Sequence, residues 1–321
     1  MLDRPNPAAA QREAFRADVI EGLSRPTRTL PSRWLYDDRG SELFEAITRL
    51  PEYYPTRTET SILMEQAEAM AAFCGPRVTL IEYGAGASLK TEILIAALAE
   101  PAVYAPVDIA GDFLLAAAAR VESRFPWLEI RPVVADFTAD FELPRGLPAL
   151  NRRVGFFPGS TIGNLTPHEA VAFLDRMRGH VDGTDAGEAG RAIVGVDLVK
   201  DLETLLAAYD DAAGVTAAFN LNLLARVVRE LGAEADLDGF AHEARWNAAE
   251  SAVEMHLVAT SAQEIRLDGE IFRFRAGETI HTESSRKHTV EGFGRLAAAA
   301  GWDLGEVWTD ADEAFAVAGL V

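Results

Sequence analysis

Hydrophobic residues recur along the middle of this 321-residue chain in a pattern that alternates between strands and helices. Short, continuous apolar runs bounded by turn residues are typical of strands that are buried on both faces of a parallel sheet. We expect five such strands, over residues 78–83, 103–108, 130–135, 154–158 and 192–198. Apolar residues at helical spacing lie between them, as the crossovers of parallel strands require. The pattern predicts an α/β fold with a doubly wound sheet.

The helix expected after the fourth strand has a well-defined start. In Thr166-Pro167-His168-Glu169, a threonine is followed three residues later by a glutamate, and a proline takes the first helical position. This is the capping-box pattern with the proline placement that helix starts prefer. We therefore expect a helix to begin at Pro167.

The pattern changes after residue 198. Helical spacing over 198–209 and 215–231 gives way to short alternating segments over 252–260, 264–267 and 271–275, which read as strands. Asp268-Gly269 separates the last two and predicts a hairpin turn. A helix over 290–300 and a strand over 303–309 can then complete the parallel sheet.

These changes predict an α+β insertion that forms a second domain with the N-terminal segment, which is mostly helical in pattern. We expect one domain to comprise residues 61–195 and 286–321. We expect the other to comprise residues 1–60 and 196–285.

Charge and composition narrow the possible partners. The formal net charge is −20 and the isoelectric point is about 4.7, so nucleic acid is a poor candidate partner. The chain has no apolar run long enough to cross a bilayer, and its first sixteen residues lack a signal-peptide core. The lone Cys74 cannot form an internal disulfide, and the six histidines show no metal-site spacing. We expect a cytoplasmic monomer that acts on a small molecule, with no metal, membrane or nucleic acid partner.

A glycine-rich turn follows the first expected strand. In Glu82-Tyr83-Gly84-Ala85-Gly86, the glycines let the backbone approach a ligand, and the next helix offers unpaired N–H groups. A dinucleotide fingerprint needs a third glycine where Leu89 stands, which counts against a nicotinamide enzyme. An acidic residue directly before Gly-x-Gly resembles the first motif of S-adenosylmethionine-dependent methyltransferases.

Acidic residues also end the next two expected strands. Asp108 follows Gly84 by roughly the 20 residues at which a carboxylate reaches ribose hydroxyls. Asp136 and Phe137 end the third strand, and an acid beside an aromatic ring suits an adenine. Lys90 is either a solvated charge at a helix start or an anchor for a cofactor carboxylate.

A second group of residues points to a polar substrate. The segment 159–164 follows the fourth strand, and its small residues leave space beside Asn164, whose amide both donates and accepts hydrogen bonds. The segment can equally be an ordinary turn before a capped helix. By pattern alone, Tyr209, Glu283 and Ser285 would be surface residues.

Several long motifs carry a family resemblance. Residues 33–44 and 51–59 resemble the N-terminal signature of the histidine-specific S-adenosylmethionine-dependent methyltransferases, which make hercynine, the trimethylbetaine precursor of ergothioneine. Segments 159–164, 197–201 and 208–220 resemble the same family. The resemblance spans nearly the whole chain. It implies a Rossmann-like methyltransferase domain interrupted by a histidine-binding domain, and transfer of up to three methyl groups to the α-amino nitrogen of L-histidine.

The resemblance also implies site residues. It places S-adenosylmethionine on Gly84, Lys90, Asp108, Asp136 and Phe137. It places histidine on Tyr54, Asn164, Tyr209, Met255, Glu283, Ser284 and Ser285. Tyr54 and Asn164 are the candidates for orienting the amine, and no general base stands out. Glu283 and Ser285 suit the two nitrogens of an imidazole.

Two alternatives remain at this point. One is N-methylation of another amino acid such as tryptophan, although an indole has one donor and no ring acceptor to match Glu283 and Ser285. The other is a cofactor-binding protein without catalysis. Turnover by the purified protein separates them.

Overall fold

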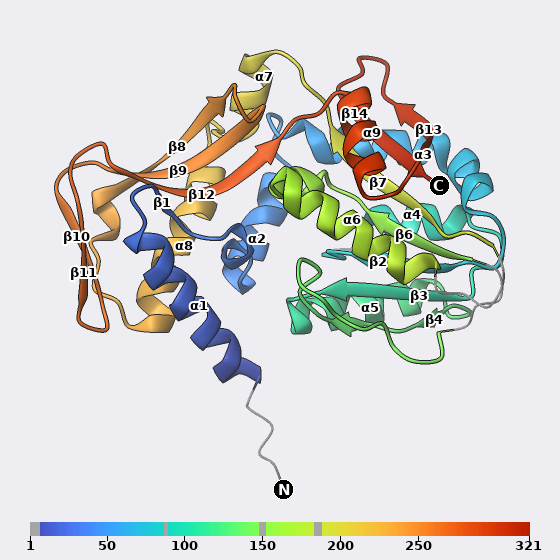
Figure 1. The fold of residues 1–321 in the computed structure, drawn as a ribbon, viewed down its shortest axis with the longest axis horizontal. Coiled ribbons are helices and arrows are strands. Elements are labelled where there is room, and N and C mark those ends of the chain that lie inside the picture. The colour runs from blue at the N-terminus through green and yellow to red at the C-terminus, as the bar shows by residue number, and fades with distance from the viewer. Residues whose placement is uncertain (1–6, 87–88, 148–151, 183–187) are drawn as a thin grey trace, which may run out of the picture. The chain divides into compact units, whose positions relative to one another are not determined.

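The computed structural model describes residues 7–86, 89–147, 152–182 and 188–321 (Figure 1). Ala87 and Ser88, which follow the second glycine of the turn, and residues 183–187 before the fifth expected strand lie outside these ranges. The chain divides into two compact units. The inserted unit comprises Met1–Tyr54 and Asp201–Ser285, and the doubly wound unit comprises Pro55–Lys200 and Arg286–Val321.

The doubly wound unit is built on an eight-stranded sheet. Its strands are β2 (Thr79–Tyr83), β3 (Val103–Asp108), β4 (Glu129–Ile130), β5 (Val133–Val134), β6 (Arg153–Phe157), β7 (Arg191–Asp197), β13 (Leu304–Thr309) and β14 (Phe315–Leu320). The order is β13-β14-β7-β6-β2-β3-β4, with β5 also paired to β3. Strand β14 runs antiparallel to both neighbours, whereas β2, β3, β4, β5, β6 and β7 are parallel.

Helices cover both faces of this sheet (Figure 1). They are α3 (Tyr54–Cys74), α4 (Leu89–Ala97), α5 (Gly111–Arg124), α6 (Pro167–Asp182) and α9 (Val290–Ala299). Successive β2 residues enter opposite cores, because strand side chains alternate. Leu80 lies in the core formed with α3, α4 and α5, and Ile81 lies in the core formed with α6 and α9. The predicted doubly wound α/β sheet is confirmed.

The strand order places the expected ligand site. From β2 the chain moves outward to β3 and β4, and it then returns to β6 on the other side of β2. This reversal is a topological switch point, and ligands of open α/β sheets bind at the carboxyl ends of the strands beside it. The turn containing Gly84 and Gly86 lies at that end of β2.

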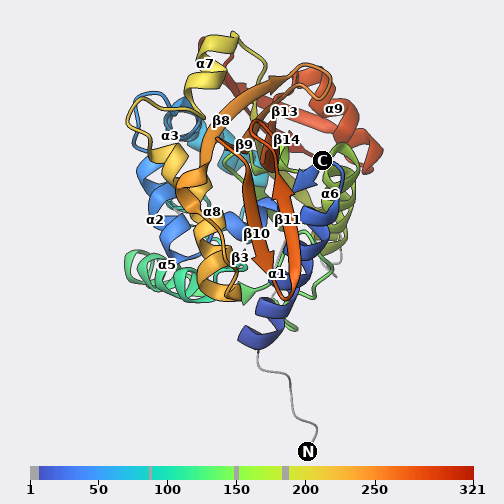
Figure 2. The ribbon, with the colours of Figure 1, turned by 90° about the vertical axis from the view of Figure 1, so that its left-hand side faces the viewer.

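The inserted unit contains a four-stranded sheet in the order β1-β12-β9-β8. It also contains a β10–β11 hairpin, which Figure 2 shows. The strands are β1 (Arg28–Thr29), β8 (Phe240–Asn247), β9 (Ala252–Ala259), β10 (Gln263–Leu267), β11 (Glu270–Phe274) and β12 (Thr279–Arg286). The helices are α1 (Pro7–Ser24), α2 (Asp38–Ile47), α7 (Leu202–Ala207) and α8 (Val215–Leu231). Phe219 and Leu223 of α8 share one core with Val253 and Leu257 of β9, so α8 covers one face of this sheet.

The predicted capping box at Thr166 and the predicted hairpin turn at Asp268-Gly269 are both confirmed. Thr166 and Glu169 form the capping box, with Thr166 N donating to Glu169 Oε2 at 2.8 Å and Glu169 N donating to Thr166 Oγ1 at 3.3 Å. Asp268 and Gly269, with φ of 51° and 86°, join β10 and β11. Such a pair with positive φ matches the twist of a hairpin.

Other element boundaries differ from expectation. The strand expected over 130–135 is two short strands, β4 and β5. Helix α3 begins at Tyr54, and Pro55 takes its first turn, where its missing N–H has no helical partner to lose. Strands β1, β8, β12 and β14 were not predicted at all.

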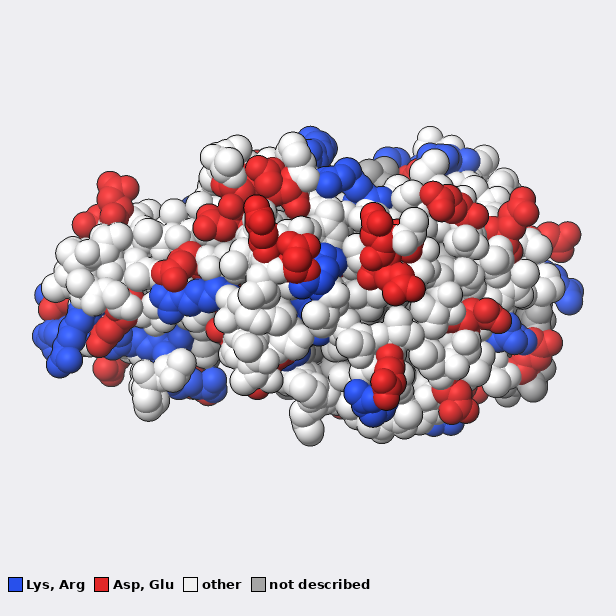
Figure 3. Space-filling model, turned by 90° about the horizontal axis from the view of Figure 1, so that it is seen from above, with Lys and Arg blue, Asp and Glu red and all other residues white. Residues whose placement is uncertain are grey.

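The described surface is strongly charged. Figure 3 shows one face, on which acidic side chains are spread widely and several basic side chains lie near the left-hand end. In the described ranges, no helix is both long enough and apolar enough to cross a membrane.

Candidate functional site

The glycine turn is fixed to the end of β3 by main-chain hydrogen bonds. Gly84 N and Ala85 N both donate to Val107 O, at 2.8 and 3.2 Å. Gly86 N donates to Asp108 Oδ2 at 3.2 Å. Gly84 and Gly86 have φ of 68° and 45°, a region that residues with a Cβ rarely adopt. The turn therefore places bare backbone beside a carboxylate.

Asp108 is held in place from two sides. Besides Gly86 N, its carboxylate accepts from Ala110 N at 2.9 Å. Burial raises the pKa of Asp108, although the N–H groups of Ala110, Gly86 and Ile109 oppose the shift. A fixed, half-buried carboxylate of this kind can accept hydrogen bonds from a ligand's hydroxyl groups.

Phe137 lies directly against the glycine turn. A Cβ on Gly84 would come 3.3 Å from Phe137 Cε1, so a larger residue there would push the ring away. Phe157 and Phe173 hold the ring by edge contacts at 5.4 and 5.5 Å between centroids. Asp136 Oδ1 accepts from Thr138 N at 2.9 Å, which fixes the start of this loop. The structure thus brings the predicted residues Gly84, Asp108 and Phe137 together.

Lys90 forms an ion pair with a carboxylate that the sequence did not single out. Its Nζ contacts Glu59 of α3, whose side chain is 1% exposed, while Lys90 itself is 18% exposed. Both Glu59 oxygens lie 2.9 Å from Gly159 N, in the loop after β6. A Cβ on Gly195 would come within 2.2 Å of Glu59 Oε1, so only glycine fits there. Lys90 is therefore a positioned cation at the helix start, not a solvated one.

Glu82, two residues before the first glycine of the turn, is buried within β2. Its buried carboxyl accepts from Thr91 Oγ1 at 2.5 Å and from the Tyr104 hydroxyl. Burial raises the pKa of Glu82 to about 8, even though these two hydrogen bonds lower it. Through these two hydrogen bonds Glu82 joins β2 to α4 and β3.

We expect Glu82→Gln to stabilise the protein more at pH 8 than at pH 5. The unfolded pKa of glutamate is about 4.3, so the folded state holds an extra proton in the window up to about 8. Folding stability from this group is therefore lost as pH rises through the window. Glutamine keeps the shape without titrating, and the gap should grow by a few kcal/mol, at about 1.36 kcal/mol per pH unit. Urea unfolding measures it.

Glu122→Gln, on the exposed face of α5, is the matched control and should leave the pH dependence of unfolding unchanged. Parallel curves for wild type and Glu82→Gln between pH 5 and 8 would show that Glu82 is ionised in the folded protein.

Asn164 ends the short helix η2 (Thr161–Asn164) that follows β6 in the doubly wound unit. Ser160 starts η2 with φ of 55°, and its Oγ accepts from Asp197 N at 2.8 Å. A Cβ on Gly163 would come 2.6 Å from Arg286 O. Asn164 is the one predicted histidine-binding residue in this unit; the others belong to the inserted unit.

In the inserted unit, polar side chains predicted to bind the substrate are in contact with a cluster of aromatic rings. The Tyr209 hydroxyl donates to Ser285 Oγ at 2.7 Å. The pKa of the Tyr36 hydroxyl is raised well above its usual value, first by burial and then by the charge of Glu283, with which Tyr36 also forms a hydrogen bond. The rings in edge or tilted contact are Tyr36, Phe44, Tyr53, Tyr209 and Phe219.

The expectation that Tyr209, Glu283 and Ser285 lie on the surface is wrong. They are 8%, 7% and 4% exposed. Along β12, burial alternates up to Thr282, and then two successive residues, Thr282 and Glu283, are buried before the alternation resumes. This one-residue shift, of the kind that a β-bulge produces, turns Glu283 and Ser285 toward the buried side.

The same shift places Ser284 on the other side of β12. Its Oγ lies 2.9 Å from His281 Nε2, although strict alternation would turn residues 281 and 284 to opposite faces. Met255 of β9 is 2% exposed in the core of the unit, and Tyr54, at the start of α3, is 9% exposed. The structure therefore groups Glu283 with Tyr36, and Ser285 with Tyr209, but not Ser284 with them.

Three of the histidines, His180, His242 and His288, are partly buried. His180 stacks on Tyr83 with 6.1 Å between ring centroids, His242 is hydrogen-bonded through both ring nitrogens, and burial lowers the pKa of His288 to about 4. Among the described residues, no group of three or more His, Cys, Asp or Glu side chains is placed to hold a metal ion.

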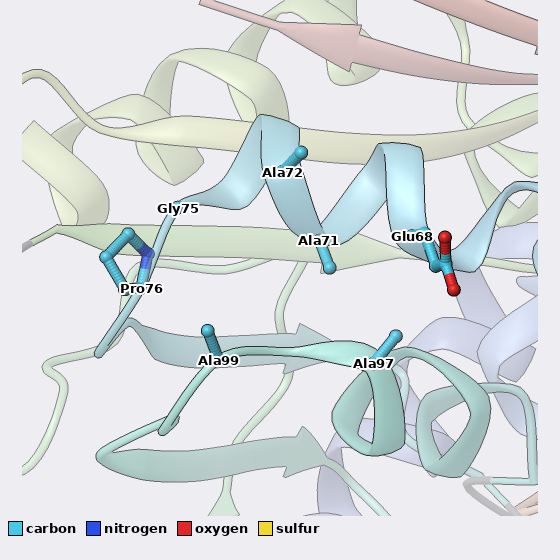
Figure 4. A pocket seen from close by; sticks show the side chains of 7 residues that line it. All are labelled: Glu68, Ala71, Ala72, Gly75, Pro76, Ala97 and Ala99. Carbon is cyan, nitrogen blue, oxygen red and sulfur yellow. The ribbon is translucent and has the colours of Figure 1, made fainter.

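The doubly wound unit also contains a pocket of about 310 Å³ (Figure 4). This pocket is a poorer candidate for binding a ligand than the glycine turn at the carboxyl end of β2. It precedes β2, at the amino ends of the strands, whereas ligands of such sheets bind at the carboxyl ends. Its lining offers one charged group and no convergent polar groups of the kind a specific ligand needs. The lining residues are Glu68, Ala71, Ala72, Gly75, Pro76, Ala97 and Ala99.

The chain is similar to known methyltransferases. A model of the family described as histidine-specific, S-adenosylmethionine-dependent methyltransferases matches residues 15–321. The histidine N-alpha-methyltransferases of Mycolicibacterium smegmatis and Mycobacterium tuberculosis are 44% and 43% identical over 94% and 92% of this chain, and 93% and 91% of their own lengths. A solved structure of S-adenosylmethionine-bound CalS10, an amino pentose methyltransferase from Micromonospora echinaspora, aligns with a TM-score of 0.45 at 13% identity, over 89% of this chain and 97% of its own.

Proposed function

The chain belongs to the family of histidine-specific, S-adenosylmethionine-dependent methyltransferases, and on that premise we propose that it methylates the α-amino nitrogen of L-histidine up to three times. The product is then hercynine, and a Neurospora crassa relative named ergothioneine biosynthesis protein 1 fits this product. The observation that carries the proposal is the family match over residues 15–321, which spans parts of both compact units.

We propose that the doubly wound unit, residues 55–200 and 286–321, holds the cofactor. The fit rests on the bare backbone at Gly84, the fixed Asp108 carboxylate and the Phe137 ring beside them. Asp108 suits ribose hydroxyls, and Asp136 with Phe137 suits an adenine. Lys90, a positioned cation, suits the carboxylate of the cofactor. When bound, S-adenosylmethionine supplies a methyl group on a positively charged sulfur.

We propose that the inserted unit, residues 1–54 and 201–285, recognises histidine. Glu283 accepts from one ring N–H, and Ser285 serves the other ring nitrogen. The single hydroxyl proton of Tyr209 is donated to Ser285 Oγ in the structure, and we propose that it turns to the substrate carboxylate when histidine binds. Met255 lines the imidazole pocket, and Ser284 contributes through its main chain, because its side chain contacts His281.

The chain's own part in the reaction is positioning. The substrate amine must be unprotonated to attack, and aliphatic amines hold a proton at neutral pH. Tyr54 and Asn164 are proposed to orient the amine, and the proton leaves to water. Holding donor and acceptor in line and excluding solvent can supply roughly 7–11 kcal/mol of the barrier. Such a reaction needs no strong base.

Mass spectrometry of L-histidine incubated with the protein and S-adenosylmethionine tests the function. We expect products heavier by one, two and three methyl groups, with the trimethylated form accumulating. Asp108→Asn, which keeps the shape of a proposed cofactor ligand but removes its charge, should slow formation of all three. Parallel incubations with tryptophan address the alternative substrate. Absence of methylated histidine at saturating cofactor would refute the proposal, and absence of any methylated amino acid would favour a non-catalytic binding protein.

A further inference from the structure

A cluster of three polar side chains in the inserted unit, two of them buried and the third partly buried, has no part in the function described so far. Asn220 of α8 is fully buried. Its Nδ2 donates to His242 Nδ1 at 2.9 Å and to His256 O at 3.1 Å, and its Oδ1 accepts from Thr282 Oγ1 at 2.6 Å. The cluster of Asn220, His242 and Thr282 therefore joins α8 to strands β8, β9 and β12.

The proton positions follow from the acceptors. His242 Nε2 lies 2.8 Å from Tyr209 O, and a carbonyl oxygen can only accept, so Nε2 carries the proton. His242 Nδ1 is then the acceptor for Asn220 Nδ2. The Thr282 hydroxyl has one proton and two acceptors, Asn220 Oδ1 and Met255 O at 3.0 Å. Each polar atom of the cluster has a partner, as a stable buried network requires.

The cluster reaches the main chain of the proposed histidine pocket at three places. His242 holds the carbonyl of Tyr209, Thr282 holds the carbonyl of Met255, and Thr282 directly precedes Glu283. The alternation of buried and partly exposed residues along β12 shifts at Thr282, which is followed directly by the buried Glu283. The hydrogen bonds of the Thr282 hydroxyl therefore fix the backbone at the position of this shift. No member of the cluster is itself a proposed ligand of histidine.

We propose that Asn220, His242 and Thr282 are positioning residues that set the geometry of Tyr209, Met255 and Glu283 for the amino acid substrate. This rests on the proposed function. Burial alone does not account for the cluster, because replacing paired buried polar groups with apolar groups of the same shape is often nearly neutral for stability. A polar network instead specifies one arrangement, with donors and acceptors at fixed angles, and a binding pocket needs that precision.

Thr282→Val and Thr282→Ser test the proposal. Valine keeps the shape of threonine and loses the hydroxyl, whereas serine keeps the hydroxyl. We expect Thr282→Val to raise the KM for histidine about tenfold, the loss expected from one misplaced hydrogen bond. The Kd for S-adenosylhomocysteine, measured by calorimetry, should stay within about twofold. Thr282→Ser should restore the histidine KM. Thr279→Val makes the same chemical change in β12 outside the cluster and should match wild type.

A second pair of variants, at His242, tests the proposal even if Thr282→Val does not fold. His242→Gln keeps a donor and an acceptor, and His242→Leu removes both, so only the leucine variant should raise the histidine KM. An unchanged KM in folded Thr282→Val or His242→Leu overturns the proposal, and so does an equal loss of affinity for both ligands. Wild-type turnover tests the proposed function separately. If another amino acid is the substrate, the same comparison is made with its KM, and no turnover with any amino acid overturns both.

Discussion

Replacing Glu283 with alanine is expected to lower kcat/KM for histidine by roughly 10²–10⁴-fold, while the Kd for S-adenosylhomocysteine stays within about twofold. Glu283 is buried, and the Tyr36 hydroxyl donates to it. A charge-assisted hydrogen bond is worth roughly 1.5–3 kcal/mol, and an imidazole N–H left unpaired in a buried pocket adds about 1–3 kcal/mol. Steady-state kinetics and calorimetry on one preparation measure both effects.

The selectivity of Glu283→Ala for histidine over other amino acids is a more specific test of the role of Glu283 than the loss of activity. A pocket built to hydrogen-bond one group rejects analogues that lack it, because its polar atoms are then unpaired. Without Glu283 that penalty disappears, so the ratio of kcat/KM for histidine to that for phenylalanine or tryptophan should fall. Glu283→Gln keeps an acceptor and should lose less. Glu264→Ala makes the same truncation on the exposed β10–β11 hairpin and should have little effect. Unchanged selectivity in Glu283→Ala would contradict the role of Glu283 as imidazole selector.

The doubly wound sheet was predictable because its signals are local and apolar. Buried parallel strands are continuous hydrophobic runs, and the glycine turn and the capping box need particular residues at particular positions. Gly84, Asp108 and Phe137 could be placed at one end of the sheet from strand order alone. Their hydrogen bonds and ring contacts bear out that placement.

The inserted unit was less predictable, because one of its buried strands is mostly polar. Strand β12 reads Thr-Ile-His-Thr-Glu-Ser-Ser-Arg. Its buried Ile280 joins the apolar core, but the buried polar residues that follow meet Asn220, Tyr36 and Tyr209. No hydrophobic period marks such a strand, and Glu283 could be found only through the family resemblance. Glu59 was missed because its partners, Lys90 and Gly159, are distant in the sequence.

Replacing Asp197 with asparagine is expected to lower the free energy of unfolding of the doubly wound unit by about 3–5 kcal/mol. Asp197 has no exposed surface and accepts from Lys287 Nζ at 2.7 Å and Lys200 Nζ at 2.6 Å. The Lys287 side chain is also fully buried. Asparagine would leave this ammonium group without a counter-charge, which is far more costly than losing an exposed pair.

The position of the Asp197–Lys287 ion pair explains why its loss should destabilise more than the immediate contacts. Asp197 O accepts from His288 N at 3.0 Å, and Val199 N donates to His288 O at 2.9 Å. These bonds join the two segments by which the chain leaves the doubly wound unit after Lys200 and re-enters it at Arg286. A fall in Tm of roughly 10 °C follows from the expected free-energy change. Calorimetry and urea unfolding measure the two quantities.

The pH dependence distinguishes an ion pair from simple packing. Burial alone would raise the pKa of Asp197, but Lys287 and Lys200 overcome it and hold the pKa below its usual value. Its stabilising contribution is therefore present above the unfolded pKa of about 3.9 and is lost as pH falls through the lower folded pKa. The gap between wild type and Asp197→Asn should then be full at pH 7 and close in strong acid. Glu291→Ala breaks an exposed pair with Arg295 and should change the free energy of unfolding by less than about 1 kcal/mol. A gap of the same size at every pH would mean that the shape of Asp197, not its charge, stabilises this junction.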